Sequence, residues 1–357
     1  MDALTTPLNW QRVRLGDILT LKHGRDYKNF KLGNIPVYGS GGYMLSINNF
    51  LHNGESVCIG RKGTIDKPIY LNGKFWVVDT LFYSYSFKKS IPKFIFYAFS
   101  IIKWSNYNEA TGVPSLTKMT ISNIEIPLPP LDEQIAIANI LSGLDHYLYS
   151  LDALILKKEG VKKALRIKML NQILASNGVE FKKIGEICLI KRGRVIAKKI
   201  LQENGKYPVY SSQTLNNGIL GFIDTYDFDG EFLTWTTDGA YAGSVFYRNG
   251  RFSITNVCGL LQVIQDNIIH KYLYYILQIT APLHVNPGMG NPKLMSAAMQ
   301  QIKIPLPPLN EQIAIANVLS ALDNEIISLK NKKRQFENIK KALNHDLMSA
   351  KIRVLKE

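Results

Sequence analysis

The chain has 357 residues, of which 46% are hydrophobic and 20% charged, so its composition is that of a globular protein and not of a disordered one. The length predicts two or three units of about 100–200 residues each. Lys and Arg number 43 against 28 Asp and Glu, and this net charge of +15 favours a polyanionic partner, most often nucleic acid. A basic protein kept soluble by its charge is the alternative interpretation.

No apolar run approaches the roughly 18–20 residues that a membrane span needs, so no membrane partner is expected. Residues 1–10 lack the basic and apolar regions of a signal peptide. Cys58, Cys188 and Cys258 form no CxxC pair, which argues against a disulfide framework or a cysteine-based zinc site. These features together predict a cytoplasmic protein.

The main feature of the sequence is an internal duplication. Residues Ile124–Asp145 and Ile302–Asp323 are offset by 178 positions and match at 18 of 22. Weaker matches reach the start of each half, where Lys22-His23-Gly24-Arg25 resembles Lys191-Arg192-Gly193-Arg194. The chain therefore reads as two copies of one unit, each a variable globular part followed by a strongly repeated segment.

The first globular part, residues 1–130, is expected to be rich in strands. Short apolar runs at Ser56–Ile59 and Phe75–Val78 flank a turn signal at Asn72-Gly73, and a helical stretch follows near 93–102. The second globular part, residues 176–308, repeats this pattern with a strand at Gly243–Tyr247, a turn at Asn249-Gly250 and a helical stretch near 269–279. We expect two similar α+β units, each with a small glycine-rich sheet.

Two long helices are expected after these globular parts, over residues 131–175 and 309–357. Proline-rich segments at 127–130 and 305–308 cannot continue a helix, and acidic residues follow them, as is common in a first helical turn. A 4–3 apolar spacing then runs for about 40 residues, which predicts coiled-coil helices of about 60 Å. The predicted seam comprises Ile137, Leu141, Leu144, Leu148, Leu151, Ile155, Lys158, Lys162, Leu165 and Met169 in the first helix, and Ile315, Leu319, Leu322, Ile326, Leu329, Lys333, Phe336, Lys340, Leu343 and Leu347 in the second.

Chain order predicts how these helices run. The first helix leads from one globular part to the other, and the second follows the second part, so a pair without a long extra connection is antiparallel. That arrangement puts the globular parts at opposite ends and the termini near each other, with an approximate two-fold repeat inside one chain. The alternative is a broad-faced helix packed only on its own globular part.

No motif in the chain predicts catalysis. The sequence lacks a P-loop, an HExxH motif and the Asp/Asn-Pro-Pro-aromatic motif of amino-methyltransferases, and the six histidines show no ligand spacing. We therefore expect no catalytic residue, no metal site and no cofactor in this chain.

Polar and basic loops recur at corresponding places in the two halves and are the candidates for contact with double-stranded DNA. Side chains of these types read base edges or hold phosphate, although any one such loop is more often a solvated turn. We interpret Trp235 as a core residue and Gly24 and Gly193 as turn glycines. The DNA-binding candidates are Lys22, His23, Arg25, Lys28, Ser40, Tyr43, Arg61, Lys62 and Thr64 in the first half, and Lys191, Arg192, Arg194, Ser211, Ser212, Gln213, Asn216, Thr236, Thr237, Asp238 and Asn291 in the second.

Two variable units alternating with two nearly identical Pro-Leu-Pro-Pro-Leu-x-Glu-Gln helices resemble the specificity (S) subunit of type I restriction-modification systems, over essentially the whole chain. The resemblance implies an α+β fold in which two target-recognition domains are joined by two long antiparallel coiled-coil helices. It implies that each domain reads half of a split, asymmetric DNA site. It further implies two methyltransferase (M) subunits that methylate adenine with S-adenosylmethionine and, in some systems, an ATP-driven restriction (R) subunit. The chain itself would be non-catalytic.

The helix starts carry identical residues outside the predicted seam, which mutual helix packing does not require. Two copies of one partner, each binding one helix start, would require them, so we expect Gln134, Asn139, Gln312 and Asn317 to bind a partner. Recent duplication is the competing explanation. Two other functions stay open: a stand-alone bivalent DNA-binding protein without enzyme partners, and an enzyme with a dispersed active site.

Overall fold

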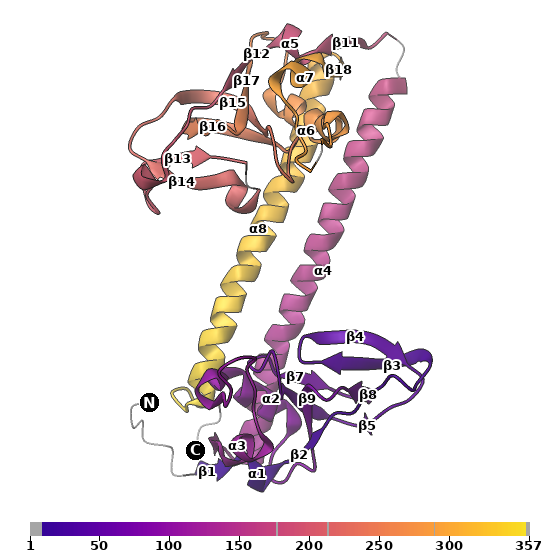
Figure 1. Ribbon diagram of the computed structural model, residues 1–357, viewed down its shortest axis with the longest axis vertical. Coiled ribbons are helices and arrows are strands. Elements are labelled where there is room, and N and C mark those ends of the chain that lie inside the picture. The colour runs from indigo at the N-terminus through magenta and orange to yellow at the C-terminus, as the bar shows by residue number, and fades with distance from the viewer. Residues whose placement is uncertain (1–8, 176–177, 213, 289, 355–357) are drawn as a thin grey trace. The chain divides into compact units, whose positions relative to one another are not determined.

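The computed structural model describes residues 9–175, 178–212, 214–288 and 290–354 (Figure 1). Its internal contacts divide the chain into two compact units. Unit 1 comprises Met1–Ala153 and Asn331–Glu357, and unit 2 comprises Leu154–Lys330. Each unit therefore contains one globular part and a portion of each long helix, α4 (Leu131–Ala175) and α8 (Leu309–Met348).

Unit 1 contains two four-stranded sheets and a two-stranded ribbon, with strand orders β2-β9-β6-β7, β4-β3-β8-β5 and β1-β10. Its main core lies between helix α2 and the first of these sheets, where Phe94, Tyr97 and Phe99 are fully buried. The elements are β1 (Gln11–Arg14), α1 (Leu15–Ile18), β2 (Thr20–His23), β3 (Leu32–Gly39), β4 (Gly42–Ile47), β5 (His52–Asn53), β6 (Ser56–Gly60), β7 (Ile69–Leu71), β8 (Lys74–Val77), β9 (Leu81–Tyr85), α2 (Pro92–Ile101), the 3-10 helix η1 (Trp104–Tyr107), α3 (Lys118–Asn123) and β10 (Glu125–Leu128).

Unit 2 contains one six-stranded sheet of order β12-β17-β15-β16-β13-β14 and a ribbon of β11 and β18. Trp235 is completely buried in its core, as predicted, and a Cβ on Gly259 would lie 2.1 Å from the indole ring. The elements are β11 (Glu180–Lys183), α5 (Ile184–Ile187), β12 (Cys188–Arg192), η2 (Lys198–Ile200), β13 (Tyr207–Tyr210), η3 (Leu215–Gly218), β14 (Ile219–Ile223), β15 (Phe228–Thr236), β16 (Val245–Ile254), β17 (Cys258–Val263), α6 (His270–Thr280), η4 (Ala281–His284), α7 (Ser296–Gln301) and β18 (Lys303–Leu306).

The predicted turn at Asn249-Gly250 is wrong, because strand β16 continues through it. Gly250 pairs with Gly230 of β15, and both glycines have positive φ, +98° and +128°. Glycine adopts such angles without a Cβ penalty, so the two strands accommodate this conformation while their pairing continues on both sides.

The expectation of two long antiparallel helices is confirmed, but α8 ends at Met348, and the described residues after it, 349–354, are not helical as we predict for 309–357. None of the predicted seam residues is exposed. In unit 1, Asp152 of α4 pairs with Lys333 of α8 at 2.7 Å, and the rings of Tyr147 and Phe336 lie 4.7 Å apart. The partner number in α8 rises as the number in α4 falls, which is the signature of antiparallel helices.

Unit 2 shows the same direction of pairing. Lys158 of α4 pairs with Glu325 of α8 at 2.8 Å, and Lys162 pairs with Asp323 further along α4. The outer parts of the seam also pack on the globular parts, since Ile137 and Leu141 belong to the core of unit 1. The fold class is therefore α+β with long antiparallel helices, as the sequence predicts.

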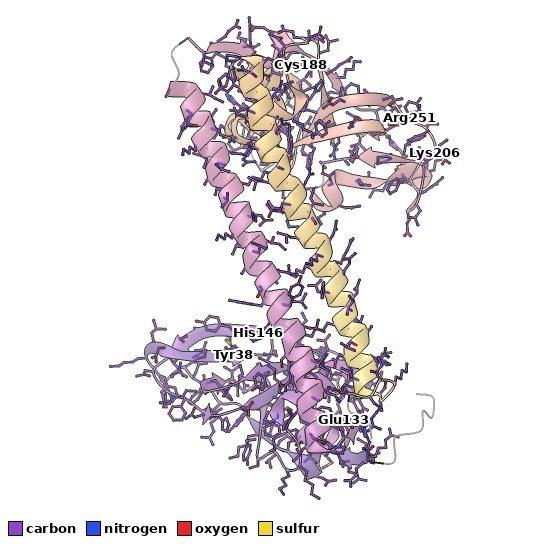
Figure 2. All side chains as sticks on the ribbon, turned by 180° about the vertical axis from the view of Figure 1, so that it is seen from behind. Tyr38, Glu133, His146, Cys188, Lys206 and Arg251 are labelled. Carbon is purple, nitrogen blue, oxygen red and sulfur yellow. The ribbon has the colours of Figure 1, made fainter. Side chains whose placement is uncertain are left out.

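Residues near the two termini meet at the start of α4 within unit 1. The buried carboxylate of Glu133, labelled in Figure 2, accepts hydrogen bonds from Trp10 Nε1 at 3.0 Å and from Arg353 Nε at 2.8 Å. A buried carboxylate needs such partners, because its desolvation would otherwise be costly. This contact fastens the segment after α8 to the globular part.

Candidate nucleic-acid interface

In unit 1, two chain segments that are distant in sequence run side by side in opposite directions, and their backbones are hydrogen-bonded together. Lys62 bridges Ser115, Gly63 N–H donates to Pro114 O at 2.9 Å, and Leu116 N–H donates to Arg61 O at 2.8 Å. We call this pair of segments the crossing; it consists of residues 61–63 and 114–116. It brings the predicted Arg61–Thr64 loop against a second loop that is distant in sequence.

The same crossing recurs in unit 2, in residues 237–239 and 292–294. Asp238 bridges Lys293, Gly239 N–H donates to Pro292 O at 3.0 Å, and Leu294 N–H donates to Thr237 O at 2.8 Å. Gly63 and Gly239 have nearly the same positive φ, +91° and +94°. The backbone frame is therefore duplicated, while the side chains that it presents differ.

Gly24 and Gly193 each bring the end of a strand to the same side of a unit as the crossing. Contrary to our expectation, neither lies in a turn, and neither has positive φ. They allow a close approach instead: a Cβ would lie 2.0 Å from Val78 O at Gly24 and 2.3 Å from Ile254 O at Gly193. Any side chain at either position would collide with backbone.

The crossing of unit 1 borders a hollow of about 520 Å³, which we call the basic hollow. The pKa of His23 is lowered, first by partial burial and then by the positive charges of Lys118 and Arg61. The His23 ring packs at 4.8 Å from that of Phe82. The lining residues are His23, Arg61, Lys62, Phe82, Ser115, Leu116, Thr117, Lys118 and Met119.

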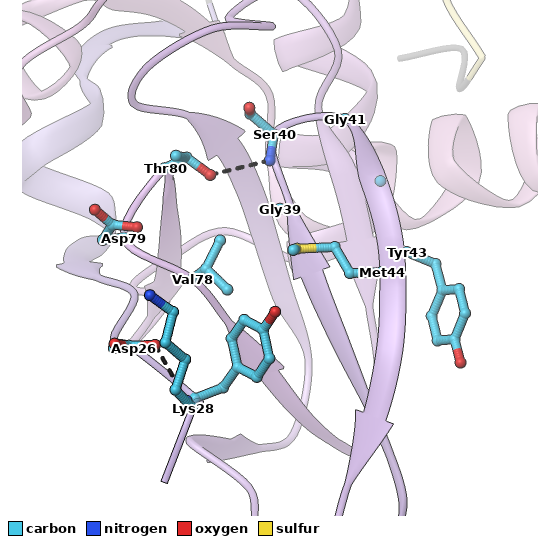
Figure 3. A pocket seen from close by; sticks show the side chains of 12 residues that line it. Asp26, Lys28, Gly39, Ser40, Gly41, Tyr43, Met44, Val78, Asp79 and Thr80 are labelled. Atoms are coloured by element: carbon cyan, nitrogen blue, oxygen red, sulfur yellow. Dashed lines mark hydrogen bonds between the residues drawn. The ribbon is translucent and has the colours of Figure 1, made fainter. Parts of the chain in front are cut away.

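A second hollow in unit 1, of about 780 Å³, lies between the β3–β4 hairpin and two loops (Figure 3). It brings together Lys28, Ser40 and Tyr43 from the predicted set. Ser40 N–H donates to Thr80 Oγ1 at 3.3 Å, which holds the hairpin tip to the neighbouring loop. Tyr43 is 62% exposed and projects away from the hollow in Figure 3.

The other predicted residues of unit 1 line neither hollow. Lys22 lies on the opposite face of β2 from His23, with its ammonium 4.4 Å from the centre of the Tyr85 ring. The backbone carbonyl of Arg25 accepts a hydrogen bond from Trp76 Nε1 at 2.7 Å. Thr64 is partly buried in the loop that follows the crossing.

In unit 2, two predicted arginines are held by partners within the chain. Arg192 Nη2 donates to Asn256 O at 2.8 Å, and Arg194 pairs with Asp227 at 3.0 Å. Lys191 precedes them and is exposed. DNA contact by Arg194 would therefore compete with an existing ion pair.

The polar candidates of unit 2 fall into a buried and a more accessible group. Thr236 and Thr237 are buried, so direct contact with DNA is not open to them, and Thr236 Oγ1 instead donates to Ser212 O at 3.5 Å. Ser211 shares a hydrogen bond with Thr255 at 2.9 Å. Residues that are at least partly exposed are Ser212, Asn216, Asp238 and Asn291, while Gln213 lies outside the described residues.

The sequence reasoning missed Lys118, which lines the basic hollow beside the first crossing, and Lys293, which is part of the second crossing. The 178-residue offset could have found them, because it aligns Pro114 with Pro292 and so aligns Ser115 with Lys293 and Lys118 with Ser296. Considered alone, a lysine near Pro114 or Pro292 and outside a glycine-rich loop carries no local sign of DNA binding.

At the helix starts, Gln134 and Gln312, which we expect to bind a partner, do not lie on the surface. Both are buried. Gln134 accepts from Ile91 N–H at 3.0 Å and donates to Lys89 O and Pro129 O, at 3.0 and 2.8 Å. Gln312 makes the corresponding three bonds in unit 2. Their identity is thus explained by contacts inside each unit.

Another identical set joins each long helix to its globular part. In unit 1, Tyr97 of α2 donates to Asp145 of α4 at 2.7 Å, and Asp145 also pairs with Lys340 of α8. Burial raises the pKa of Tyr97 above its usual value, which keeps its hydroxyl a donor. We call this trio the joint of unit 1.

Unit 2 has an equivalent joint of Tyr275, Asp323 and Lys162, again with a tyrosine-to-aspartate distance of 2.7 Å. The two lysines come from the parts of α4 and α8 that lie opposite each aspartate. Each joint therefore fixes three elements with one carboxylate.

An exposed face remains at each helix start, and it is nearly the same in both copies. Ile135 and Asn139 lie one turn apart on it, and Ile135 is 48% exposed. The two faces, which we call the helix-start faces, consist of Leu131, Ile135, Ala136, Asn139, Ile140 and Gly143 in α4 and of Leu309, Ile313, Ala314, Asn317, Val318 and Ala321 in α8.

Within the described residues, no group of three or more His, Cys, Asp and Glu side chains is placed to hold a metal ion. The described helices also include none that is both long enough and apolar enough to span a bilayer.

Comparisons with known proteins agree with this arrangement. The family model for the type I restriction modification DNA specificity domain matches residues 7–158 and 176–338. The chain is 39% identical over 223 residues to the putative type I specificity subunit S.MpnORF365P of Mycoplasma pneumoniae, a match that covers 60% of this chain and 81% of that one. It is 46% identical over 141 residues to the type I restriction enzyme MpnII specificity subunit of the same organism, covering 39% and 42%.

Among solved structures, the S subunit of a type I restriction-modification system from M. genitalium superposes with a TM-score of 0.73 at 18% identity, covering 97% of each chain. A likeness at this level of identity concerns the fold.

Proposed function

Because the chain belongs to the family of type I restriction-modification specificity subunits, we propose that it selects the DNA on which methyltransferase subunits act by reading a bipartite, asymmetric site. Each unit reads one half of the site with the loops around its crossing. The chain contributes recognition and docking, and the methyltransferase subunits contribute the chemistry. A restriction subunit joins where the system encodes one.

The observation that carries this proposal is a duplicated frame with divergent side chains. Arg61 and Lys62 of the first crossing correspond to Thr237 and Asp238 of the second. An aspartate accepts hydrogen bonds and repels phosphate, while arginine and lysine donate and attract it. Two frames so differently equipped read different bases, so the two half-sites differ.

Methylome sequencing tests this point directly. A host that expresses the chain with its methyltransferase is expected to carry methylated motifs made of two unlike short halves separated by unspecified bases. A continuous motif or a perfect palindrome contradicts the bipartite, asymmetric reading.

The methyltransferase subunits are proposed to dock on the helix-start faces, one on each. Exposed apolar residues such as Ile135 and Ile313 are favourable to bury against a partner. Ile135 and Ile313 correspond at the 178-residue offset, and Leu131, Ala136 and Asn139 also recur unchanged in the other copy, as two copies of one partner require. Buried Gln134 and Gln312 have no direct part in this docking.

Co-purification tests the docking. The unaltered chain is expected to retain about two methyltransferase subunits, Ile135→Glu or Ile313→Glu about one, and the double variant none, because a buried unpaired carboxylate costs several kcal/mol. Leu156→Glu is the matched control, since Leu156 is also on α4 and is 71% exposed but has no equivalent at the helix starts. An unaltered chain that binds DNA but retains no methyltransferase favours a stand-alone bivalent DNA-binding protein.

A further inference from the structure

The basic hollow of unit 1 gathers positive charge from three separate segments. Arg61 and Lys62 come from the crossing, Lys118 from the start of α3, and His23 from the end of β2. When His23 is neutral, the positive charge of the hollow comes from Arg61, Lys62 and Lys118 alone. Convergence of this kind from distant parts of the chain suits a compact anion.

The groups around His23 favour its neutral form while the hollow is empty. Lys118 and Arg61 repel a proton on the ring, and Phe82 offers it no charge. No carboxylate belongs to the lining of the basic hollow among the described residues: Glu109 accepts from the hydroxyls of Thr117 and Thr120, and Asp79 lines the other hollow of unit 1.

The equivalent place in unit 2 is equipped differently. Arg192, which is permanently charged, stands where unit 1 has His23, and Asp238 stands where unit 1 has Lys62. Lys118 is replaced by Ser296. The second crossing therefore lacks the titrating ring, and the carboxylate of Asp238 there offsets part of the positive charge of Arg192 and Lys293.

We propose that the basic hollow binds one backbone phosphate of DNA and that His23 takes up a proton when the phosphate enters. This inference rests on the proposed function and adds to it a phosphate site and a proton linkage confined to one unit. Arg61, Lys62 and Lys118 hold the phosphate oxygens. The imidazolium then donates a hydrogen bond from a ring whose charge the phosphate offsets.

The direction of the linkage follows from these charges. In the free chain the pKa of His23 is lowered, and a bound phosphate neutralises the neighbouring cations and raises it. Binding therefore takes up a proton between the two pKa values, and DNA affinity rises as the pH falls through that window. Below the pKa of the free chain the ring is already charged, and no further gain is expected.

The test measures the affinity of the full chain for a fluorescent duplex of about three helical turns. It runs at several pH values between about 6 and 8, where an unperturbed histidine titrates. The unaltered chain is expected to bind more tightly at low pH, by at most about tenfold per pH unit for one proton. His23→Gln is expected to lose that component, and His23→Arg to keep the high affinity across the range.

A salt titration separates the phosphate site from general electrostatics. Lys118→Ala is expected to reduce the slope of log affinity against log salt by up to about 0.9, the full value for one phosphate contact, because Arg61 and Lys62 still face the phosphate. Lys88→Ala removes the same charge beyond the opposite end of β9 and is expected to change the slope little, which makes it the matched control.

A His23→Gln variant with the full pH dependence of the unaltered chain overturns the proposal but not the proposed function, because DNA still binds. Equal slope changes for Lys118→Ala and Lys88→Ala overturn it as well. An unaltered chain that binds no duplex at any pH overturns both.

Discussion

The joint of each unit predicts a local loss of stability when its tyrosine hydroxyl is removed. Tyr97→Phe deletes the donor to Asp145, and Tyr275→Phe deletes the donor to Asp323, each at 2.7 Å. A hydrogen bond to a charged group contributes about 1.5–3 kcal/mol. The aspartate keeps its lysine partner in both variants, so the ion pair itself is not broken.

The two joints differ in exposure, and this difference orders the expected effects. The Asp145 and Lys340 side chains are 35% and 25% exposed, whereas those of Asp323 and Lys162 are 28% and 16% exposed. Solvent weakens a more exposed charged interaction. Tyr275→Phe is therefore expected to cost more than Tyr97→Phe.

Hydrogen–deuterium exchange read by mass spectrometry measures the effect unit by unit, which a single unfolding curve of a two-unit chain cannot do. Tyr97→Phe should accelerate exchange in the peptide that contains α2, by about tenfold or more at about 1.4 kcal/mol per factor of ten. The peptide that contains α6 should stay unchanged. Tyr275→Phe should show the reverse pattern.

Tyr149→Phe serves as the control for loss of a hydroxyl, because Tyr149 lies on α4 and is 77% exposed. The reasoning is refuted if both joint variants exchange like the unaltered chain. It is also refuted if each accelerates both peptides equally, since that would mean that the two joints do not act within their own units.

Further predictions concern the glycines and the thiols. Gly24→Ala and Gly193→Ala should each lower the melting temperature and the DNA affinity, because the added Cβ collides with carbonyl oxygens. Gly41→Ala should change neither, since its Cβ meets no atom within 4 Å. A stable, fully binding Gly24→Ala chain would contradict the close-approach argument. Burial raises the pKa of Cys58, Cys188 and Cys258 to about 12. A disulfide reagent at about pH 8 should therefore label these thiols slowly in the native chain and rapidly in urea. Rapid labelling of the native chain would contradict their burial.

The long helices could be predicted because their information is local. An apolar period that holds for about 40 residues, with prolines ahead of it, leaves few alternatives. The strands at Ser56–Ile59 and Phe75–Val78 were equally visible, and they correspond to β6 and β8. The predicted turn at Asn249-Gly250 is wrong because this dipeptide also fits inside a continuous strand, where Gly250 adopts positive φ.

The side-chain contacts could not be predicted because their partners are distant in sequence. Gln134 reads as a partner-binding residue because nothing near it in sequence reveals the loop at Lys89–Ile91 that covers it. Asp145 reaches Lys340 across 195 positions. Lys118 is recognisable as a DNA-binding candidate only from the structure, in which the start of α3 lines the same hollow as His23.

Comparison of the two copies distinguishes the residues that hold the backbone in place from those proposed to contact DNA. Residues that repeat identically include the joints and the buried glutamines, which fix each long helix to its own unit, and most of the helix-start faces. Gly24 and Gly193, with Gly63 and Gly239, repeat because the backbone there leaves no choice. Residues that differ, such as Lys62 and Asp238, project from that fixed backbone. A unit built in this way can change what it contacts by substituting side chains, because none of the bonds that hold the crossing together involves them.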